Sequence, residues 1–181
     1  MLIRSVSSDD FEAIANLTNH YILGTAIHFG YDPVAAGELR EQWSKHRARF
    51  PFLVAELNGE FAGYAKAGTW RDRTAYSWIV ETGIYVRPEV HGRGVGKAMY
   101  RVLLDTLKAQ GFHAAIGGIT VPNAASIRLH ESVGFVHVGT VKQAGWKFNT
   151  WHDAGFWQVV LRENDHRATP TTPPPEVRVE T

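Results

Sequence analysis

The sequence predicts an α/β (α+β) fold with a central mixed, mostly antiparallel sheet and helices on both faces. The first observation is the order of the patterned segments, which reads β-α-α-β-β-β-α-β-α-β-β along the chain. The second is Asn58-Gly59 between two apolar runs, a pair typical of a β-hairpin. The third is size, because 181 residues, 44% of them hydrophobic, suit one domain with a buried core.

The N-terminal third is expected to form one strand and two helices. Residues 2–6 alternate as a short strand, and residues 7–9 offer cap chemistry for a helix with apolar side chains at helical spacing over 11–21. A second helix follows Pro33. Its basic end, residues 45–49, complements the dipole at a helix C-terminus, so we interpret it as a solvated face rather than a binding patch.

The middle of the chain alternates strands with a long helix. Strands at 52–56 and 61–65 form the predicted hairpin, and a third strand covers 77–86. It stops at Pro88, because proline has no amide hydrogen for a ladder. An amphipathic helix then runs from Gly94 to about Gln110.

The C-terminal third is expected to hold a strand at 114–120, a helix at 124–133 and a turn at 134–135 into a further strand. Phe156 to Leu161 reads as the last strand. Residues 164–181 change in character, with four prolines and no apolar periodicity. We therefore expect one domain over 1–163 and a flexible Pro-rich tail over 164–181, with a docked proline-rich ligand segment as the alternative.

Composition excludes several classes of protein. Lys+Arg 19 against Asp+Glu 18 gives a formal charge of +1, which disfavours a nucleic-acid binder with a large basic surface. The absence of cysteine removes disulfides, thiolate metal sites and a cysteine nucleophile. Nine histidines show no His-Glu-x-x-His or similar spacing, so no metal is expected. No stretch approaches the roughly 18 apolar residues of a membrane span, and we expect a soluble, cytoplasmic protein.

A glycine-rich loop follows the strand that ends near Val86. Gly92, Gly94 and Gly96 stand at alternate positions just before a helix, where backbone amides can approach an anion closely. A diphosphate fits such a loop, and a turn without a ligand is the alternative. A P-loop is disfavoured because Gly92 and Gly96 are one residue too close and Ala98 follows Lys97. A dinucleotide loop is disfavoured because the Gly-x-Gly-x-x-Gly spacing would place its third glycine later than Gly96.

Glu81 is an acid inside an otherwise apolar and aromatic strand. Burial there would raise the pKa of its carboxyl group toward the range of a general base. The alternative from the residues alone is a carboxylate exposed to water at the end of a strand.

The strand, glycine loop and helix resemble motif A of the GCN5-related N-acetyltransferase (GNAT) superfamily, with Gly94-Val95-Gly96 matching the family's loop pattern. His91 stands where the family usually has Gln or Arg. Residues 122–135, Pro-Asn-Ala-Ala-Ser-Ile-Arg-Leu-His-Glu-Ser-Val-Gly-Phe, are similar to the segment of the phosphinothricin and methionine sulfoximine acetyltransferase branch. Matches extend from Ile3 to Leu161.

The resemblance implies the GNAT fold and transfer of acetyl from acetyl-CoA to the amine of a small amino-acid-like molecule. With no cysteine in the chain, we expect direct attack in a ternary complex. The residues that the resemblance assigns to coenzyme A lie on the strand, the loop and the following helices: Ile84, Tyr85, Val86, Gly92, Arg93, Gly94, Val95, Gly96, Lys97, Asn123 and Ser132.

The resemblance also assigns the chemistry and the acceptor site. Glu81 would act as the base, directly or through water, and His130 could assist proton transfer; a structural hydrogen-bonding role for His130 is the alternative. The acceptor would contact the loop and strand around Glu81: Arg71, Arg73, Glu81, Thr82 and Gly83. Solvated loop arginines are the alternative for the two arginines. Residues 29–33 depart from the Thr-Glu-Pro type turn of relatives.

Two other functions remain open from the sequence: a GNAT enzyme for another amine or a protein N-terminus, and a non-catalytic coenzyme A sensor. Relatives are often dimers, so a homodimer is expected. Five aromatic residues could supply its interface, with core packing as the alternative: Trp146, Phe148, Trp151, Phe156 and Trp157.

Overall fold

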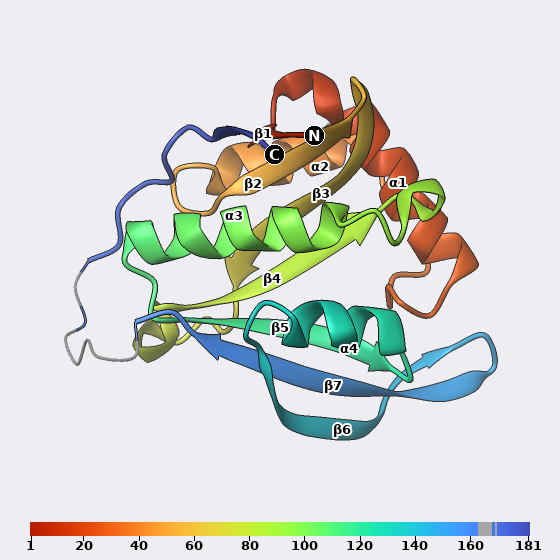
Figure 1. Ribbon diagram of the computed structural model, residues 1–181. Coiled ribbons are helices and arrows are strands. Elements are labelled where there is room, and N and C mark those ends of the chain that lie inside the picture. The colour runs from red at the N-terminus through yellow and green to blue at the C-terminus, as the bar shows by residue number, and fades with distance from the viewer. Residues whose placement is uncertain (163–167, 169) are drawn as a thin grey trace.

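The computed structural model describes residues 1–162, 168 and 170–181. In these residues the strands form one eight-stranded sheet in the order β6-β7-β5-β4-β3-β2-β1-β8. Every neighbouring pair is antiparallel except β4 and β5, which are parallel. Helices α3 and α4 cover one face of the sheet, and α1 and α2 cover the other (Figure 1). The predicted mixed, mostly antiparallel sheet with helices on both faces is confirmed.

The strands are β1 (Leu2–Ser5), β2 (Phe52–Leu57), β3 (Glu60–Thr69), β4 (Ile79–Val86), β5 (Ala114–Val121), β6 (Val136–Lys147), β7 (Thr150–Val160) and β8 (Arg178–Glu180). The helices are α1 (Phe11–Gly24), α2 (Ala36–His46), α3 (Val95–Gln110) and α4 (Ala124–Glu131). Among the described residues, none of these helices is long and apolar enough to cross a membrane.

The strand predicted at 156–161 begins six residues earlier than expected. It is part of β7, which pairs with β6 across a two-residue turn at Phe148 and Asn149. Both turn residues have positive φ, of 50° and 56°, as a type I′ hairpin turn requires. Since phenylalanine rarely occupies such a position, the sequence carries a weak turn signal there, and the hairpin was missed.

The register of β3 and β4 determines which side chains share a face. Tyr64 lies opposite Tyr85 and Gly68 opposite Glu81, so these side chains point to the side of α1 and α2. Ala65, opposite Ile84, points to the side of α3. The core is accordingly in two parts, one between the sheet and α3 and one between the sheet and α1.

The parallel strands β4 and β5 separate halfway along their length. Their pairing runs from Ile79 opposite Ala114 to Thr82 opposite Gly117, although β4 continues to Val86 and β5 to Val121. Beyond Thr82 the backbone of β4 therefore has no strand on its β5 side. This opening lies near the N-terminal ends of α3 and α4 (Figure 1).

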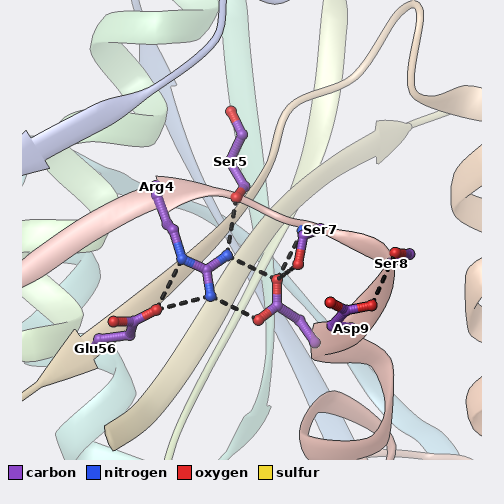
Figure 2. Close-up of polar contacts among 7 residues, drawn as sticks. Arg4, Ser5, Ser7, Ser8, Asp9 and Glu56 are labelled. Atoms are coloured by element: carbon purple, nitrogen blue, oxygen red, sulfur yellow. Dashed lines mark hydrogen bonds and ion pairs between the residues drawn. The ribbon is translucent and has the colours of Figure 1, made fainter. Parts of the chain in front are cut away.

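An ion-pair network fastens the N-terminal segment to the sheet. Arg4 donates two hydrogen bonds to Asp10, of 2.8 and 2.7 Å, and one to Glu56, of 2.8 Å (Figure 2). The Asp10 carboxylate also accepts from the Ser7 amide at 2.7 Å. These contacts join β1, the turn before α1 and β2.

The end of the chain differs from the expected flexible tail. Residues 163–167 and 169 lie outside the described residues, but β8 pairs with β1 as the last strand of the sheet. Val177 is buried at 7% exposure, and the Thr172 amide donates to the Gln110 carbonyl at 2.9 Å. The two valines around Arg178 supply a short strand pattern, which the preceding prolines obscured in the sequence. The two termini lie side by side (Figure 1).

Candidate active site

A cavity of about 60 Å³ occupies the opening between β4 and β5. Its walls include Thr82 and Ile84 from β4, Gly118 and Thr120 from β5, and His130 from α4. Three of the residues predicted to bind coenzyme A line this cavity: Ile84, Tyr85 and Asn123.

Backbone amides of β4 face this opening. The Arg87 amide donates to the Ala62 carbonyl of β3 at 2.9 Å, which makes this an exchanging pair of the antiparallel ladder. Because the amides of a strand alternate in direction, those of Ile84 and Val86 point away from β3, toward the opening. The amide of Tyr85 points to β3, and its side chain packs on Tyr64 at 5.2 Å between ring centroids. The geometry thus favours Ile84 and Val86, rather than Tyr85, as amides that could orient a carbonyl.

The glycine loop stands at the end of the same strand. Gly92 and Gly94 have φ of +77° and +80°, the left-handed region that glycine adopts without strain. Gly94 is the residue before α3, so the first amides of α3, including those of Val95 and Lys97, have no intrahelical acceptor. The loop therefore presents amides and the positive end of a 16-residue helix dipole to an anion.

Gly96 has a different reason for being glycine. A Cβ there would lie 3.0 Å from Leu129 Cδ2 of α4 and 3.7 Å from Val86 Cγ2. Glycine at this position therefore allows the close approach of α3 and α4, in addition to any role in binding an anion.

His91, which departs from the family pattern, folds back on the strand. Its Nε2 lies 3.0 Å from the Val86 carbonyl oxygen and 3.2 Å from the Tyr21 hydroxyl, which donates to the same carbonyl at 2.7 Å. The imidazole is exposed at the loop but turned to the end of β4. Arg93 is exposed on the same loop.

Glu81 lies on the α1 side of the sheet, beside the point where β4 and β5 separate. Its Oε1 is 3.5 Å from where a Cβ at Gly118 would stand, so the glycine leaves room for the carboxylate. Glu81 is exposed to solvent at this opening, as the alternative from the sequence had it. Partial desolvation by the surrounding protein nevertheless raises the pKa of its carboxyl group, and the Lys66 ammonium partly opposes this effect. Such a carboxylate is suited to accept a proton near neutral pH.

His130 is 3% exposed and hydrogen-bonded at both ring nitrogens. Nε2 lies 2.7 Å from the Tyr100 hydroxyl, and Nδ1 lies 2.8 Å from the Ser126 carbonyl oxygen. A Cβ at Gly117 would be 2.5 Å from Nε2, so the imidazole packs against β5 where the strands separate. Burial lowers the pKa of His130 and favours the neutral ring.

Other predicted residues lie in varied positions. The Thr82 hydroxyl is buried on the α3 side and donates to the Ile116 carbonyl at 3.2 Å, so it faces away from Glu81. Gly83 lies on the Glu81 side. Asn123 caps α4 through its Oδ1, which accepts from the Ser126 amide at 3.1 Å. Ser132 lies at the opposite end of α4, where its hydroxyl donates to the Leu129 carbonyl at 2.8 Å.

Both predicted arginines are exposed to solvent, but their neighbours differ. The Arg71 guanidinium carbon lies 5.1 Å from the Trp70 ring centroid and 6.0 Å from that of Tyr76. Trp70 in turn meets Phe156 edge to face at 5.5 Å. Since Phe156 also contacts the space above Gly118, this aromatic chain links Arg71 to the Glu81 region. The side chain of Arg73 is exposed at the start of a 3₁₀ turn.

Residues 29–33 dock on the β6–β7 hairpin. Phe29 packs on the backbone of Gly145, and the Tyr31 hydroxyl donates to the Trp146 carbonyl. The ammonium group of Lys147, which is 3% exposed, donates to the carbonyls of Ile22 and His28. The aromatic residues proposed for either a dimer interface or the core fall into two groups. Trp157 is buried in the core, whereas Trp146, Phe148 and Trp151 are about half exposed.

Sequence reasoning missed three residues near this site. Tyr100 and Ser126 line the cavity and hold His130, and Lys66 of β3 shares a face with Glu81. Ser126 stands four residues before His130, a helical spacing that could have indicated the contact. Lys66 interrupts a run of small apolar residues, which was the available signal. Over the residues with described positions, no three His, Asp or Glu side chains gather to hold a metal ion.

The chain is similar to known acetyltransferases over most of its length. The family model described as an acetyltransferase (GNAT) domain matches residues 3–156. The phosphinothricin N-acetyltransferase of Streptomyces viridochromogenes is 40% identical over 156 residues, covering 86% of this chain and 85% of that protein. The L-methionine sulfoximine/L-methionine sulfone acetyltransferase of Salmonella typhimurium is 37% identical over 166 residues, covering 91% and 96%.

Among solved structures, an acetyltransferase of Salmonella typhimurium with its cofactor acetyl-CoA superposes with a TM-score of 0.87 at 35% identity. The alignment covers 93% of this chain and 97% of that one.

Proposed function

The chain belongs to the GNAT acetyltransferase family, and from this premise we propose that it transfers acetyl from acetyl-CoA to the amine of a small amino-acid-like molecule. The observation that carries the proposal is the position of Glu81 beside the opening between β4 and β5. This opening extends along β4 toward the glycine loop that follows the strand. A proton acceptor and an anion-binding loop thus stand along one strand.

The donor side is supported by the fit of the described residues to coenzyme A. The loop amides from Gly92 to Lys97 suit a pyrophosphate, and the amides of Ile84 and Val86 suit the thioester end. The Asn123 side-chain oxygen is used to cap α4, but its amide nitrogen could donate a hydrogen bond to coenzyme A at the cavity wall. Ser132, Arg93 and Tyr85 stay predictions for coenzyme A, with Ser132 the least supported by its position. Acetyl-CoA supplies an activated acetyl group on a thiolate leaving group.

The acceptor side is supported by charge and by the names of the relatives. An amine must lose a proton before it attacks, and Glu81 is placed to take it directly or through water. Arg71, held between aromatic rings, suits a carboxylate. Gly83 leaves space for the acceptor on the face that carries Glu81. The Thr82 hydroxyl points to the other face and donates to the Ile116 carbonyl, which supports a structural role for Thr82 rather than contact with the acceptor. Phosphinothricin and methionine sulfoximine, named for the relatives, are therefore the proposed class of acceptor.

We propose direct attack in a ternary complex, since the chain has no cysteine that could carry a covalent acetyl intermediate. For His130 we propose a positioning role, since both of its nitrogens are engaged and it holds Tyr100 at the cavity.

We also propose that the enzyme works as a homodimer in the cytoplasm. Exposed apolar side chains on the edge strand β6 and the hairpin tip support the first part, including Val136, Val138, Trp146 and Phe148. The need for intracellular acetyl-CoA supports the second. Sedimentation analysis of the wild type and of Val138→Lys tests the dimer, which should dissociate in the variant.

The function is tested by release of free coenzyme A thiol from acetyl-CoA with a panel of amines. Phosphinothricin, methionine sulfoximine and methionine sulfone should support turnover, and simple amines and a peptide N-terminus should not. Turnover with a peptide alone would favour a protein acetyltransferase. Tight binding of acetyl-CoA without turnover on any amine would favour a coenzyme A sensor.

A further inference from the structure

Lys66 is a partly buried lysine whose ammonium group makes no hydrogen bond or ion pair with the residues of known position. It lies on β3 between the buried Ala65 and Ala67, and its Nζ is 5.8 Å from the centroid of the Phe52 ring. Burial lowers its pKa, and Glu81 opposes this effect. Because a desolvated cation without a partner is costly, the site is suited to receive an anion.

The side chains of Lys66 and Glu81 lie on the same face of the sheet. Lys66 stands opposite Gly83, so Glu81 is its diagonal neighbour across β3 and β4. Diagonal neighbours on one face are roughly 7–8 Å apart, and their Cβ atoms are somewhat closer. A Cβ at Gly83 would meet only Tyr85 within 4 Å, at 3.8 Å, so no side chain fills the floor between the two groups.

Arg71 and Lys66 lie on opposite sides of Glu81. The strand order is β7-β5-β4-β3-β2, and the Glu81 carboxylate leans over Gly118 of β5. Arg71 is reached from there through Phe156 of β7 and Trp70. Lys66 instead extends toward Phe52 of β2. A molecule whose amine lies at Glu81 would therefore have Lys66 on its β3 side and Arg71 on its β7 side, beyond Trp70.

Other charged groups near Lys66 are already engaged. The His28 ring accepts a hydrogen bond from the Gly30 amide at 2.9 Å, and burial, with Lys147 and Lys66 nearby, lowers its pKa. Lys147 donates to two backbone carbonyls. The donors of Lys66 are thus available to a ligand in a way that those of Lys147 are not.

We propose that Lys66 binds an anionic side-chain group of the acceptor, and so selects amino acids that carry a second negative charge besides the α-carboxylate. This inference rests on the proposed function and names the acceptor more closely. The acceptor's amine lies at Glu81, its α-carboxylate lies toward Arg71, and its side chain ends in a phosphinate, phosphonate or carboxylate at Lys66.

A matched pair of acceptors tests the charge alone. Phosphinothricin and methionine sulfone have nearly the same shape, but the first ends in a charged phosphinate and the second in a neutral sulfone. Lys66→Gln should lower kcat/KM for phosphinothricin by roughly tenfold to a hundredfold, the range for loss of a charge-assisted hydrogen bond. For methionine sulfone the loss should stay within about threefold.

Two control variants and the choice of pH keep the comparison clean. Lys66→Arg keeps the charge and should retain the preference for phosphinothricin, and Lys108→Gln, at an exposed position of α3, should change neither value. Removing Lys66 also raises the pKa of Glu81, which shifts the acid limb of both pH profiles alike. The ratio is therefore taken at the pH plateau of each variant.

The possible results distinguish the role of Lys66 from the acetyltransferase function on which it rests. Equal loss for both acceptors, or no loss for phosphinothricin, overturns the assignment of Lys66 while turnover of methionine sulfone upholds the acetyltransferase. If the wild type acetylates neither acceptor nor any other amino acid, the proposed function fails and the role of Lys66 fails with it.

Discussion

The Tyr100 hydroxyl and the His130 Nε2 lie 2.7 Å apart in the buried layer between α3 and α4. The other ring nitrogen, Nδ1, faces the carbonyl oxygen of Ser126 at 2.8 Å. A carbonyl can only accept, so Nδ1 carries the ring proton and Nε2 accepts from the tyrosine. His130 is then a neutral group that fixes the Tyr100 hydroxyl at the cavity wall.

Replacement of His130 by phenylalanine should destabilise the protein by about 1–3 kcal/mol, because the buried Tyr100 hydroxyl loses its acceptor at 2.7 Å and keeps only the longer 3.4 Å contact with the Thr82 hydroxyl. The double variant with Tyr100→Phe should be more stable than His130→Phe alone, since no unpaired hydroxyl remains. Urea unfolding of the two single variants and the double variant measures this coupling. Simple addition of the two single effects would show that the pair does not act as a unit.

Replacement of Glu81 by glutamine should lower kcat by at least about a hundredfold, because the amine loses its proton acceptor. In the wild type, kcat/KM should fall as the pH drops through the raised pKa of Glu81, above its usual 4.5. Glu12→Gln, at an exposed position of α1, is the matched control and should leave the rate unchanged. An unaltered rate in Glu81→Gln would remove Glu81 as the base.

The same variant should keep or increase stability at neutral pH. Burial raises the pKa of Glu81 in the folded chain, so the unfolded chain loses this proton more readily. Above both pKa values the ionised carboxylate therefore favours the unfolded state, and an amide removes that penalty. Thermal unfolding at pH 7 checks the sign. A lower melting temperature would mean that Glu81 has a structural role that geometry does not reveal.

The glycine loop combines two kinds of constraint that substitution by alanine separates. At Gly94 the φ of +80° makes alanine strained by about 1–2 kcal/mol, and the loop should distort. At Gly96 alanine would press on Leu129 at 3.0 Å. Both variants should raise KM for acetyl-CoA. Gly37→Ala in α2, where nothing lies within 4 Å, should instead stabilise by about 0.5–1 kcal/mol with KM unchanged.

The sequence predicted the β4 strand and the glycine loop that follows it well because their signals are local. Glycine spacing, an acid among apolar residues and a proline after the strand each depend on a few neighbours in the chain. Lys66 and Tyr100 were missed because their importance comes from register across strands and from contact between helices far apart in sequence. The same reason explains β8, whose short Val-Arg-Val pattern acquires meaning only when it pairs with β1.

Replacement of Asp10 by asparagine should destabilise the protein by about 1–3 kcal/mol at neutral pH, through loss of charge-assisted bonds to Arg4. Burial alone would raise the pKa of Asp10, but Arg4 and Ser7 lower it on balance. This contribution is therefore present above the unfolded pKa and lost as the pH falls through the folded one. Asp9→Asn is the control, because the Asp9 carboxylate accepts from the exposed Ser8 hydroxyl (Figure 2) and from no other group in the described part of the chain.

Unfolding curves at pH 7 and at acid pH compare the two aspartate variants. The difference between Asp10→Asn and the wild type should shrink as the pH falls, whereas that of Asp9→Asn should stay near zero. A difference for Asp10→Asn that does not change with pH would show that the carboxylate charge contributes nothing.

Replacement of Val177 by alanine tests whether the C-terminal segment is part of the folded domain. Val177 is 7% exposed and packs in the core beneath α3, and its amide donates to the Ser5 hydroxyl at 2.9 Å. Loss of two buried methyl groups should cost about 1–3 kcal/mol. Val179→Ala, at 37% exposure two residues later, should cost less than about 0.5 kcal/mol. Because a flexible tail would give equal effects at both positions, a difference in urea midpoint between the variants decides whether β8 closes this edge of the sheet in solution.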